Sequence, residues 1–400
     1  MKFIYKMMLM AALIVAGSAP ARAIEMQDIS DAMKTKPSLN FRYRYEDVSQ
    51  DGFAKDAGAS TLRSRFSWKS GQVSNFSAGF EADYVSIIGS ERYNSTSNGK
   101  VSYPVVPDPE GFDLNQAYLK YSGESAIATV GRQRILHGSQ RFVGGVGFRQ
   151  NEQTYDALRT QFTSAGKLKF DYAYVWNVNR IFGPQDGAQP SDWLGDSHLF
   201  TVAWPITEGH TIEGFSYLLD FENDNGVPNS TETYGVNYKG SLGLVKLNLS
   251  IATQSDYGDS PLNYDAPYYL VQVDVPVSGV TFTAGYEVLG SDGGAAGFRT
   301  PLATLHKFQG WADKFLNTPA DGIEDIFVGV KGKLGPVKLA AIWHDFDADE
   351  GGRDYGSELD LLATYPVTKA LDLRLKYADY SEKGFATDTT KIWITAIFKL

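Results

Sequence analysis

The chain contains no cysteine among its 400 residues. This absence excludes a disulfide framework, a cysteine-ligated zinc site and a lipid-modified N-terminal cysteine. After residue 23 there is also no apolar run near the roughly 18 residues that a membrane-spanning helix requires. The five histidines show no His-x-x-x-His pairing, and no nucleophile elbow accompanies them. The sequence therefore favours neither an enzyme nor a cofactor.

Positive charge is scarce, because 37 lysines and arginines face 47 acids and give a formal net charge of −10. Such an acidic chain disfavours nucleic acid as a partner, since neutralising phosphates requires a basic surface. Residues 1–23 predict a cleavable export signal, with Lys2 and Lys6 before the apolar run Met7–Gly17 and a small-x-small site at Ala21-Arg22-Ala23. Removal of this segment takes the net charge from −10 to −13.

Short segments of strict apolar and polar alternation fill the rest of the chain. The clearest runs from Leu371 to Tyr377, where leucines alternate with Asp372, Arg374 and Lys376. Successive side chains of a strand point to opposite faces, so each segment has one apolar and one charged face. The apolar faces are rich in Tyr, Trp and Phe, and the pattern recurs about every twenty residues. The simplest closed solution is a barrel with lipid outside and water inside.

We predict an all-β fold, a transmembrane antiparallel up-and-down barrel of eighteen strands over residues 38–400. Short connections alternate with long ones, notably residues 87–111, 137–150, 180–195 and 290–321. Short periplasmic turns and long extracellular loops are typical of barrels in the Gram-negative outer membrane. Export through the inner membrane and periplasm would deliver the chain there.

The two ends of the predicted barrel have features of their own. Residues 24–37 form a periplasmic leader, in which Ser30–Lys34 predicts a short helix; the alternative is a segment that tucks into the pore. The last strand places an apolar row on one face, which we expect to meet lipid, and it ends in Leu400 where such barrels usually end in Phe. The members of this row are Ile392, Ile394, Ala396, Phe398 and Leu400.

Three stretches carry a family resemblance: Gly131-Arg132-Gln133, residues 141–159 and residues 301–325. Through them the chain resembles the alginate-export family of outer-membrane porins over nearly all of its mature length. The resemblance implies an eighteen-stranded barrel whose arginine-lined lumen passes an anionic polysaccharide such as alginate or another polyuronate. The periplasmic loop that helps to occlude the family's alginate exporters has no counterpart here, because every predicted periplasmic turn is short.

Strand parity and barrel closure predict which charged side chains line the pore. The last strands lie beside the first, which gathers basic residues on one inner wall, with two acids next to them and other acids across the lumen. Arginine suits such a wall because its rigid fork binds carboxylates bidentately. The alternative is that these charges only pair with one another and confer no selectivity. The basic candidates are Arg42, Arg44, Arg63, Arg65, Lys69, Arg132, Arg134, Arg149, Arg159, Arg374, Lys376 and Lys391, and the acidic ones are Glu81, Asp83, Asp220, Asp274 and Glu287.

Three loops are open to more than one interpretation. The loop His137–Gln150 is rich in glycine and carries Arg141 and Arg149, so it either folds inward and constricts the pore or stays exposed. The loop Gly290–Asp321 either folds over the mouth or covers a contact between subunits. The acidic segment Asp345–Asp354 is a solvated loop or a Ca²⁺ site, although it lacks the register of an EF-hand loop.

These features together predict a passive channel for anionic or polar solutes, including an anionic polysaccharide. The alternatives are a general porin for small polar solutes and a structural or adhesive barrel with a filled lumen. The expected partners are outer-membrane lipid and lipopolysaccharide, the barrel-assembly machinery and the solute itself. The sequence leaves open the identity of the solute, the direction of its flux, and whether the barrel is a monomer or a homo-oligomer.

Overall fold

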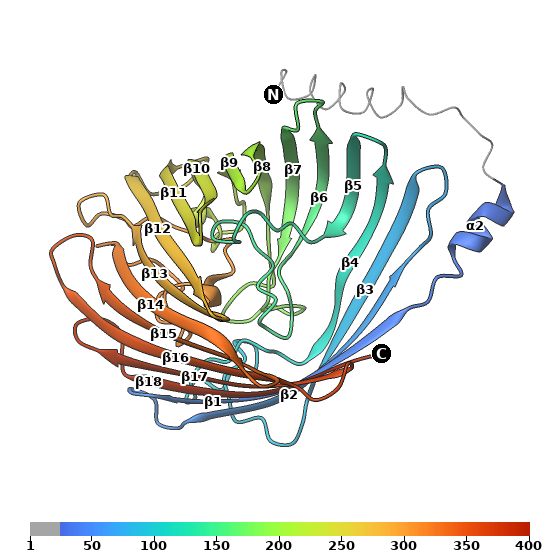
Figure 1. Ribbon diagram of the computed structural model, residues 1–400. Helices are drawn as coiled ribbons and strands as arrows, with labels where there is room; N and C mark the ends of the chain where they lie inside the picture. The colour runs from blue at the N-terminus through green and yellow to red at the C-terminus, as the bar shows by residue number, and fades with distance from the viewer. Residues whose placement is uncertain (1–24) are drawn as a thin grey trace.

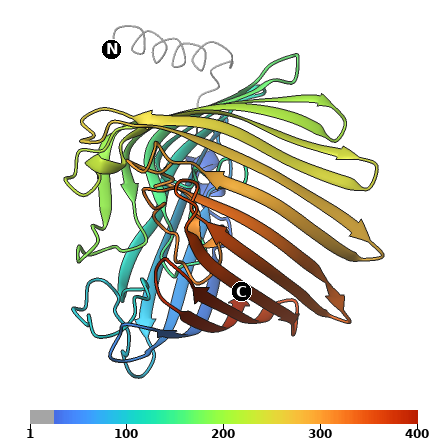
Figure 2. The ribbon, with the colours of Figure 1, turned by 90° about the vertical axis from the view of Figure 1, so that its left-hand side faces the viewer.

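A computed structural model describes residues 25–400 as a single closed β-barrel. The predicted signal peptide lies outside the described residues. Figures 1 and 2 show the strands as one continuous wall around a lumen. All eighteen predicted strands are confirmed. Their bounds are β1 Ser38–Gln50, β2 Ala57–Lys69, β3 Phe76–Ile87, β4 Gly111–Ser122, β5 Ala126–Gln133, β6 Thr154–Thr163, β7 Lys169–Asn179, β8 Asp192–Thr207, β9 His210–Leu219, β10 Thr231–Leu242, β11 Val245–Asp256, β12 Asp265–Val277, β13 Val280–Leu289, β14 Ile323–Leu334, β15 Val337–Asp347, β16 Asp354–Pro366, β17 Leu371–Glu382 and β18 Thr389–Lys399.

Each strand pairs in antiparallel register with its neighbours in sequence, and β1 closes the barrel by pairing with both β2 and β18. The seam runs without interruption from the pair Asn40–Lys399 to the pair Gln50–Thr389. Closure satisfies the backbone groups of every strand, which is what allows a sheet to cross a membrane without an exposed edge.

The two ends of the barrel differ as the sequence predicts. Short turns, such as residues 208–209, 278–279 and 335–336, lie at the end where β1 begins. The longest connections, residues 88–110, 134–153 and 290–322, lie at the opposite end. By the usual orientation of such barrels the short-turn end is periplasmic and the long-loop end is extracellular.

The helix that precedes the barrel is α2, Met26–Ala32, so the sequence-based position of Ser30–Lys34 is wrong. The helix starts earlier because Glu25 and Asp28 form a capping box that satisfies its first amide groups. It has no buried residue and lies outside the ring of strands in Figure 1. The amide of Gly71 in the β2–β3 turn donates to the carbonyl of Ala32, with 2.7 Å between nitrogen and oxygen. This segment therefore does not tuck into the pore.

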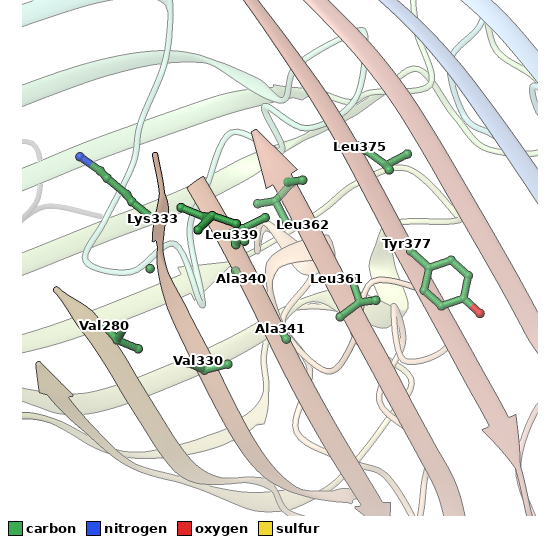
Figure 3. Close-up of a pocket in the computed structure, with 13 residues that line it drawn as sticks. Val280, Val330, Lys333, Leu339, Ala340, Ala341, Leu361, Leu362, Leu375 and Tyr377 are labelled. Atoms are coloured by element: carbon green, nitrogen blue, oxygen red, sulfur yellow. The ribbon is translucent and has the colours of Figure 1, made fainter. Parts of the chain in front are cut away.

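The outer wall carries exposed apolar side chains along every strand, as expected of a surface that meets lipid. Leu373 and the last-strand residues Ile392, Ile394 and Phe398 are among them, which confirms their predicted facing. Figure 3 shows a shallow apolar hollow of about 550 Å³ in this wall, across β13–β17, where Ala341 lies between larger leucines. No described helix is long and apolar enough to cross a membrane.

Two short 3₁₀ helices lie in the long connections, η1 at Val227–Asn229 and η2 at Leu305–Lys307. The second belongs to the 290–322 loop, which is the longest connection of the barrel. Figure 1 shows the 290–322 loop inside the ring of strands, so this loop is part of the pore.

Candidate pore constriction

Two of the long loops fold into the barrel and meet there. The loops 134–153 and 290–322 are joined by a parallel bridge between Val143 and Leu302, and the amide of Gly144 donates to the carbonyl of Leu302 over 2.8 Å. Figure 1 shows both segments inside the ring of strands. The inward fold of His137–Gln150 is therefore found, and the longer loop enters the lumen with it.

Arg149 ties the 134–153 loop to the wall. Its guanidinium Nη1 lies 2.9 Å from Oε2 of Glu46 on β1 and 3.7 Å from Oδ2 of Asp108 in the 88–110 loop. Its Nη2 reaches Asp313 of the 290–322 loop at 3.5 Å. Arg149, Glu46 and Asp108 are all buried. One guanidinium thus holds three loops and a strand together where solvent screening is weak.

Arg141 makes a second tie on the far side of the same loop. Its Nε lies 2.7 Å from Oε1 of Glu287 on β13, and its Nη2 donates to Oε1 of Gln309 over 2.8 Å. The hydroxyl of Tyr268 also donates to Glu287, over 2.6 Å. Glu287 is therefore not a free carboxylate on an acidic wall, because Arg141 neutralises it.

A third tie forms around Glu152 at the end of the loop. The carboxylate of Glu152 lies 2.6 Å from Nη1 of Arg65 and 2.5 Å from Nε of Arg134. Burial alone would raise the pKa of Glu152, yet Arg65 and Arg134 hold it well below its ordinary value. Arg65 also pairs with Asp83 on β3 at 2.5 Å, and Arg134 pairs with Glu81. The predicted neighbours Glu81 and Asp83 therefore compensate part of the basic wall.

The basic residues that remain face a narrow space between the wall and the loops. Arg42 donates to Gln150 over 2.9 Å and to two loop carbonyls, and it forms no ion pair with a carboxylate among residues 25–400. Arg44 stacks over Phe148 at 4.1 Å, and its Nη1 lies 3.7 Å from Oδ2 of Asp108, too far for a hydrogen bond. Arg63 lies beside the space without lining it; it donates to Asn40 over 2.8 Å, and its Nη1 lies 3.7 Å from Oε1 of Glu152. These three guanidinium groups carry positive charge that is only partly compensated.

The space itself is a cavity of about 250 Å³ inside the barrel. Five cations line it, together with the aromatic side chains of Phe148, Trp311 and Trp393. It lies between the inner face of the wall and the two inward-folded loops, so this cavity is the candidate constriction. The five cations are Arg42, Arg44, Arg374 and Lys376 from the wall and Lys307 from the 290–322 loop.

Lys376 is held in place by the same loop. Its ammonium lies 3.6 Å from the ring centroid of Trp311 and donates to Nε2 of His306 over 2.5 Å. His306 stacks on Phe148 at 3.6 Å between ring centroids and contacts Asp313 through Nδ1 over 2.7 Å. Burial lowers the pKa of His306 well below its ordinary value, so the ring is neutral and accepts from the lysine. The loop thereby orients a lysine toward the cavity without adding a charge at the histidine.

Lys314, in the same loop, gives the stability of the folded protein a pH dependence. Its ammonium donates to the hydroxyl of Thr389 over 2.6 Å, and burial, with nearby Lys391 adding to the effect, lowers its pKa from 10.5 to about 8. Between pH 8 and 10.5 the unfolded chain therefore binds more protons at this position than the folded one. The free energy of unfolding should rise with pH across that window through this residue. Denaturant titrations at a series of pH values give the free energy of unfolding as a function of pH. The curves of the wild type and Lys314→Met should differ in slope only between pH 8 and 10.5, and parallel curves would contradict the assignment.

The other predicted pore residues lie away from the cavity. Lys391 pairs with Asp313 at 2.8 Å. Lys69 is exposed at the short-turn end of β2, Arg132 pairs with Asp156 at 2.8 Å, and Arg159 pairs with Asp171. Asp274 accepts from Gln272 over 3.0 Å. The prediction for Asp220 is wrong, because the buried inner face of β9 is formed by Phe215, Tyr217 and Leu219, and Asp220 has the opposite parity.

The half of the lumen opposite the basic wall is aromatic rather than acidic. Phe142 of the 134–153 loop packs on Phe215, Tyr217 and Tyr268, with ring centroids 4.8, 6.2 and 5.1 Å away. Acids nevertheless face the lumen from β13, β14 and β16, where Glu287, Asp325, Glu358 and Asp360 are buried. Arg141 neutralises Glu287, whereas neither Glu358 nor Asp360 pairs with a lysine or arginine among the described residues.

Sequence reasoning missed several residues of the constriction. Phe148, His306, Lys307 and Trp311 come from loops whose inward fold strand parity does not specify, and Trp393 is an aromatic residue on the inner face of β18. A signal existed for Trp393, because it alternates with Lys391 and Thr395 on the face away from lipid. No such signal exists for the loop residues.

A closed eighteen-stranded barrel with an apolar outer wall and loops folded into its interior is the architecture of an outer-membrane channel. Residues 9–400 match the family described as Gram-negative porin, so the chain belongs to that family. The match supports the porin part of the resemblance and does not extend to the alginate-export family. It also supports an environment of outer-membrane lipid and lipopolysaccharide.

Solved structures of other outer-membrane proteins share the fold. OccAB4 of Acinetobacter baumannii is 14% identical, with a TM-score of 0.68 over 92% of this chain and 99% of that one. OpdO of Pseudomonas aeruginosa is 13% identical, with a TM-score of 0.69 over 93% and 99%. OccD3 (OpdP) of the same organism is 14% identical, with a TM-score of 0.66 over 96% and 97%. At these identities the similarity shows the fold alone. A search of curated proteins found no match.

Proposed function

We propose that this barrel is a channel that admits anionic solutes and selects them at the constriction. The observation that carries the proposal is the cavity lined by Arg42, Arg44, Arg374, Lys376 and Lys307. No carboxylate is among its lining residues, although the chain as a whole is acidic. A local surplus of cations in a narrow passage supports attraction of anions there despite the net charge of the chain.

The physical basis is the lowered cost of removing water from a charged solute. The protein walls have a low dielectric constant and focus the field of the cations into the passage, which raises the local concentration of anions. Guanidinium and ammonium groups then replace part of the hydration shell of the solute as it passes. Arginine remains charged at any working pH, so this attraction persists across the physiological range.

The folded loops support a small solute as the main substrate. A cavity of about 250 Å³ accommodates a compact carboxylate more readily than a folded polymer. The more specific proposal is that an extended uronate chain passes through the cavity one sugar residue at a time. A uronate chain should then block the single-channel current more strongly than a small carboxylate does.

The test is single-channel conductance of the refolded protein in a planar bilayer across a salt gradient. An anion-biased reversal potential supports the proposal, and block by oligouronate extends it to uronate chains. A steady current with no bias would replace the proposal by the general porin. The absence of current from correctly folded protein would favour the filled structural barrel.

Arg374 provides the sharpest single substitution. Its side chain is exposed in the cavity and forms no ion pair among residues 25–400, so its removal leaves no buried partner behind. Arg374→Gln is expected to lower the anion-to-cation permeability ratio by a factor of about 3 to 10 without loss of stability. Arg353→Gln, at an exposed position in the β15–β16 loop, is the matched control. Equal ratios in the two variants would remove Arg374 from the selectivity argument.

A general porin is the second candidate, and the pairing of Arg65, Arg134 and Arg149 with carboxylates favours it. Replacing Arg42, Arg44, Arg63 and Arg65 together by serine would not leave folding intact, because Arg65 compensates Asp83 and Glu152 in the buried interior.

A further inference from the structure

Lysines gather at the short-turn mouth of the barrel, on the inner face of the wall. On β14, Lys331 and Lys333 share a face with buried Asp325, whereas Ile326 and Val330 on the other face are exposed toward lipid. Because side chains alternate along a strand, both lysines point into the lumen. Figure 3 agrees, since the ammonium of Lys333 points away from the apolar hollow that its strand borders.

The same parity places a lysine near the short-turn end of many strands around the circumference. Within residues 25–400 none of these lysines forms an ion pair with an acid. Asp274 lies directly opposite Lys246 in the register, whereas Lys331, Lys333 and Lys338 have no acid directly opposite them. All but Lys120 are classed among the exposed residues. The set, named here the lysine ring, comprises Lys69, Lys120, Lys169, Lys239, Lys246, Lys331, Lys333, Lys338 and Lys399.

Two lysines of the lysine ring, Lys333 and Lys338, repel each other. Lys333 on β14 lies directly opposite Lys338 on β15 in the antiparallel register, and Lys331 is two residues away on the same face. Like charges directly opposite each other on neighbouring strands are destabilising. A bound anion would relieve that repulsion, so the cluster has a reason to hold one.

The long-loop end has the opposite character. Acids crowd the β15–β16 connection and its flanks, where Asp345, Asp347, Asp349 and Asp354 lie close in sequence. An anion that approaches from this side meets negative charge first, whereas one from the short-turn side meets the lysine ring first. The constriction lies between these two ends.

We propose that the lysine ring is a second anion-binding site, which takes multiply charged, flexible oxyanions from the periplasmic side. Ammonium groups are compact point charges that suit phosphate or carboxylate oxygens. Their spread around the mouth fits a ligand with several negative groups better than a single small anion. The site is separate from the constriction and does not depend on the selectivity proposed there.

The experiment is block of single-channel current by inorganic tripolyphosphate added to one side of the bilayer at a time. Orientation is assigned with Glu350→Cys in the β15–β16 loop, because the chain has no other cysteine and an impermeant thiol reagent then labels only the long-loop side. Tripolyphosphate is expected to block from the short-turn side at a concentration roughly tenfold lower than from the other side. Equal potency from the two sides would overturn the proposal.

Two double variants locate the effect. Lys333→Gln/Lys338→Gln should remove most of the difference between the two sides, whereas Lys55→Gln/Lys383→Gln removes two cations at the long-loop end and should keep it. A sided block that survives the first variant would contradict the assignment. The reversal potential of the first variant should remain that of the wild type. In the wild-type channel, a sided block without any anion bias would count against the constriction and leave the lysine ring standing.

Discussion

Replacing Arg149 by methionine is expected to lower the free energy of unfolding by about 3–5 kcal/mol and to raise the conductance of the open channel. The methionine has a similar volume but leaves the carboxylates of Glu46 and Asp108 buried without their main cation. Uncompensated buried charge favours release of the 134–153 loop from the wall. Denaturant titration measures the first effect, and single-channel current measures the second.

A double variant separates lost packing from stranded charge. Arg149→Met combined with Glu46→Gln removes both members of the shortest pair, so it should recover a substantial part of the lost stability. If the double variant is as unstable as the sum of the two single variants, the ion pair is not the source of the loss. An unchanged conductance in Arg149→Met would show that the loop stays in place without this tie.

Arginine at Leu361 is expected to destabilise the barrel by roughly 2–4 kcal/mol, the cost of a cation on the lipid-facing surface near the bilayer midplane. Leu361 lies in the middle of β16 and its side chain is exposed on the outer wall. Leu361 is preferred to Leu373, because Leu373 is only the third residue of β17 and therefore lies near the short-turn end.

The adjacent residue supplies the control. Leu362 carries the same side chain one position further along, where strand parity turns it to the lumen and it lines the constriction. Leu362→Glu, which places a carboxylate directly opposite Lys376, should therefore cost much less stability, as measured by refolding into lipid vesicles over a denaturant series. Equal losses at the two positions would mean that the faces of β16 are assigned the wrong way round.

The barrel was predictable because the alternation of apolar and polar residues within each strand shows which face meets lipid and which faces the lumen. The alternation from Leu371 to Tyr377 specifies one wet and one apolar face without reference to the rest of the chain. The constriction was not predictable in the same way, because its ties join residues such as Arg149 and Glu46 that are 103 positions apart. Neither residue carries a local sign of the other, so sequence placed the arginines near the pore and left their partners unassigned.

In the leader, a local signal determines where the helix starts and a distant contact determines where the helix lies. The start of α2 depends on the capping box between Glu25 and Asp28, which is a local feature visible in sequence. Its contact with Gly71 depends on the β2–β3 turn, which is distant in sequence. A reading of Ser30–Lys34 as the helix overlooked the first signal and had no access to the second.

The seam between β1 and β18 has a consequence for how the protein is made. These strands are the first and the last of the barrel, yet they pair over the full span from Asn40–Lys399 to Gln50–Thr389. During synthesis and export, β1 is therefore delivered long before its second partner exists. Until β18 arrives the sheet is open, with an unpaired row of backbone donors and acceptors on each side that invites association with other chains. Those two edges must therefore be kept from other chains until the seam is sealed.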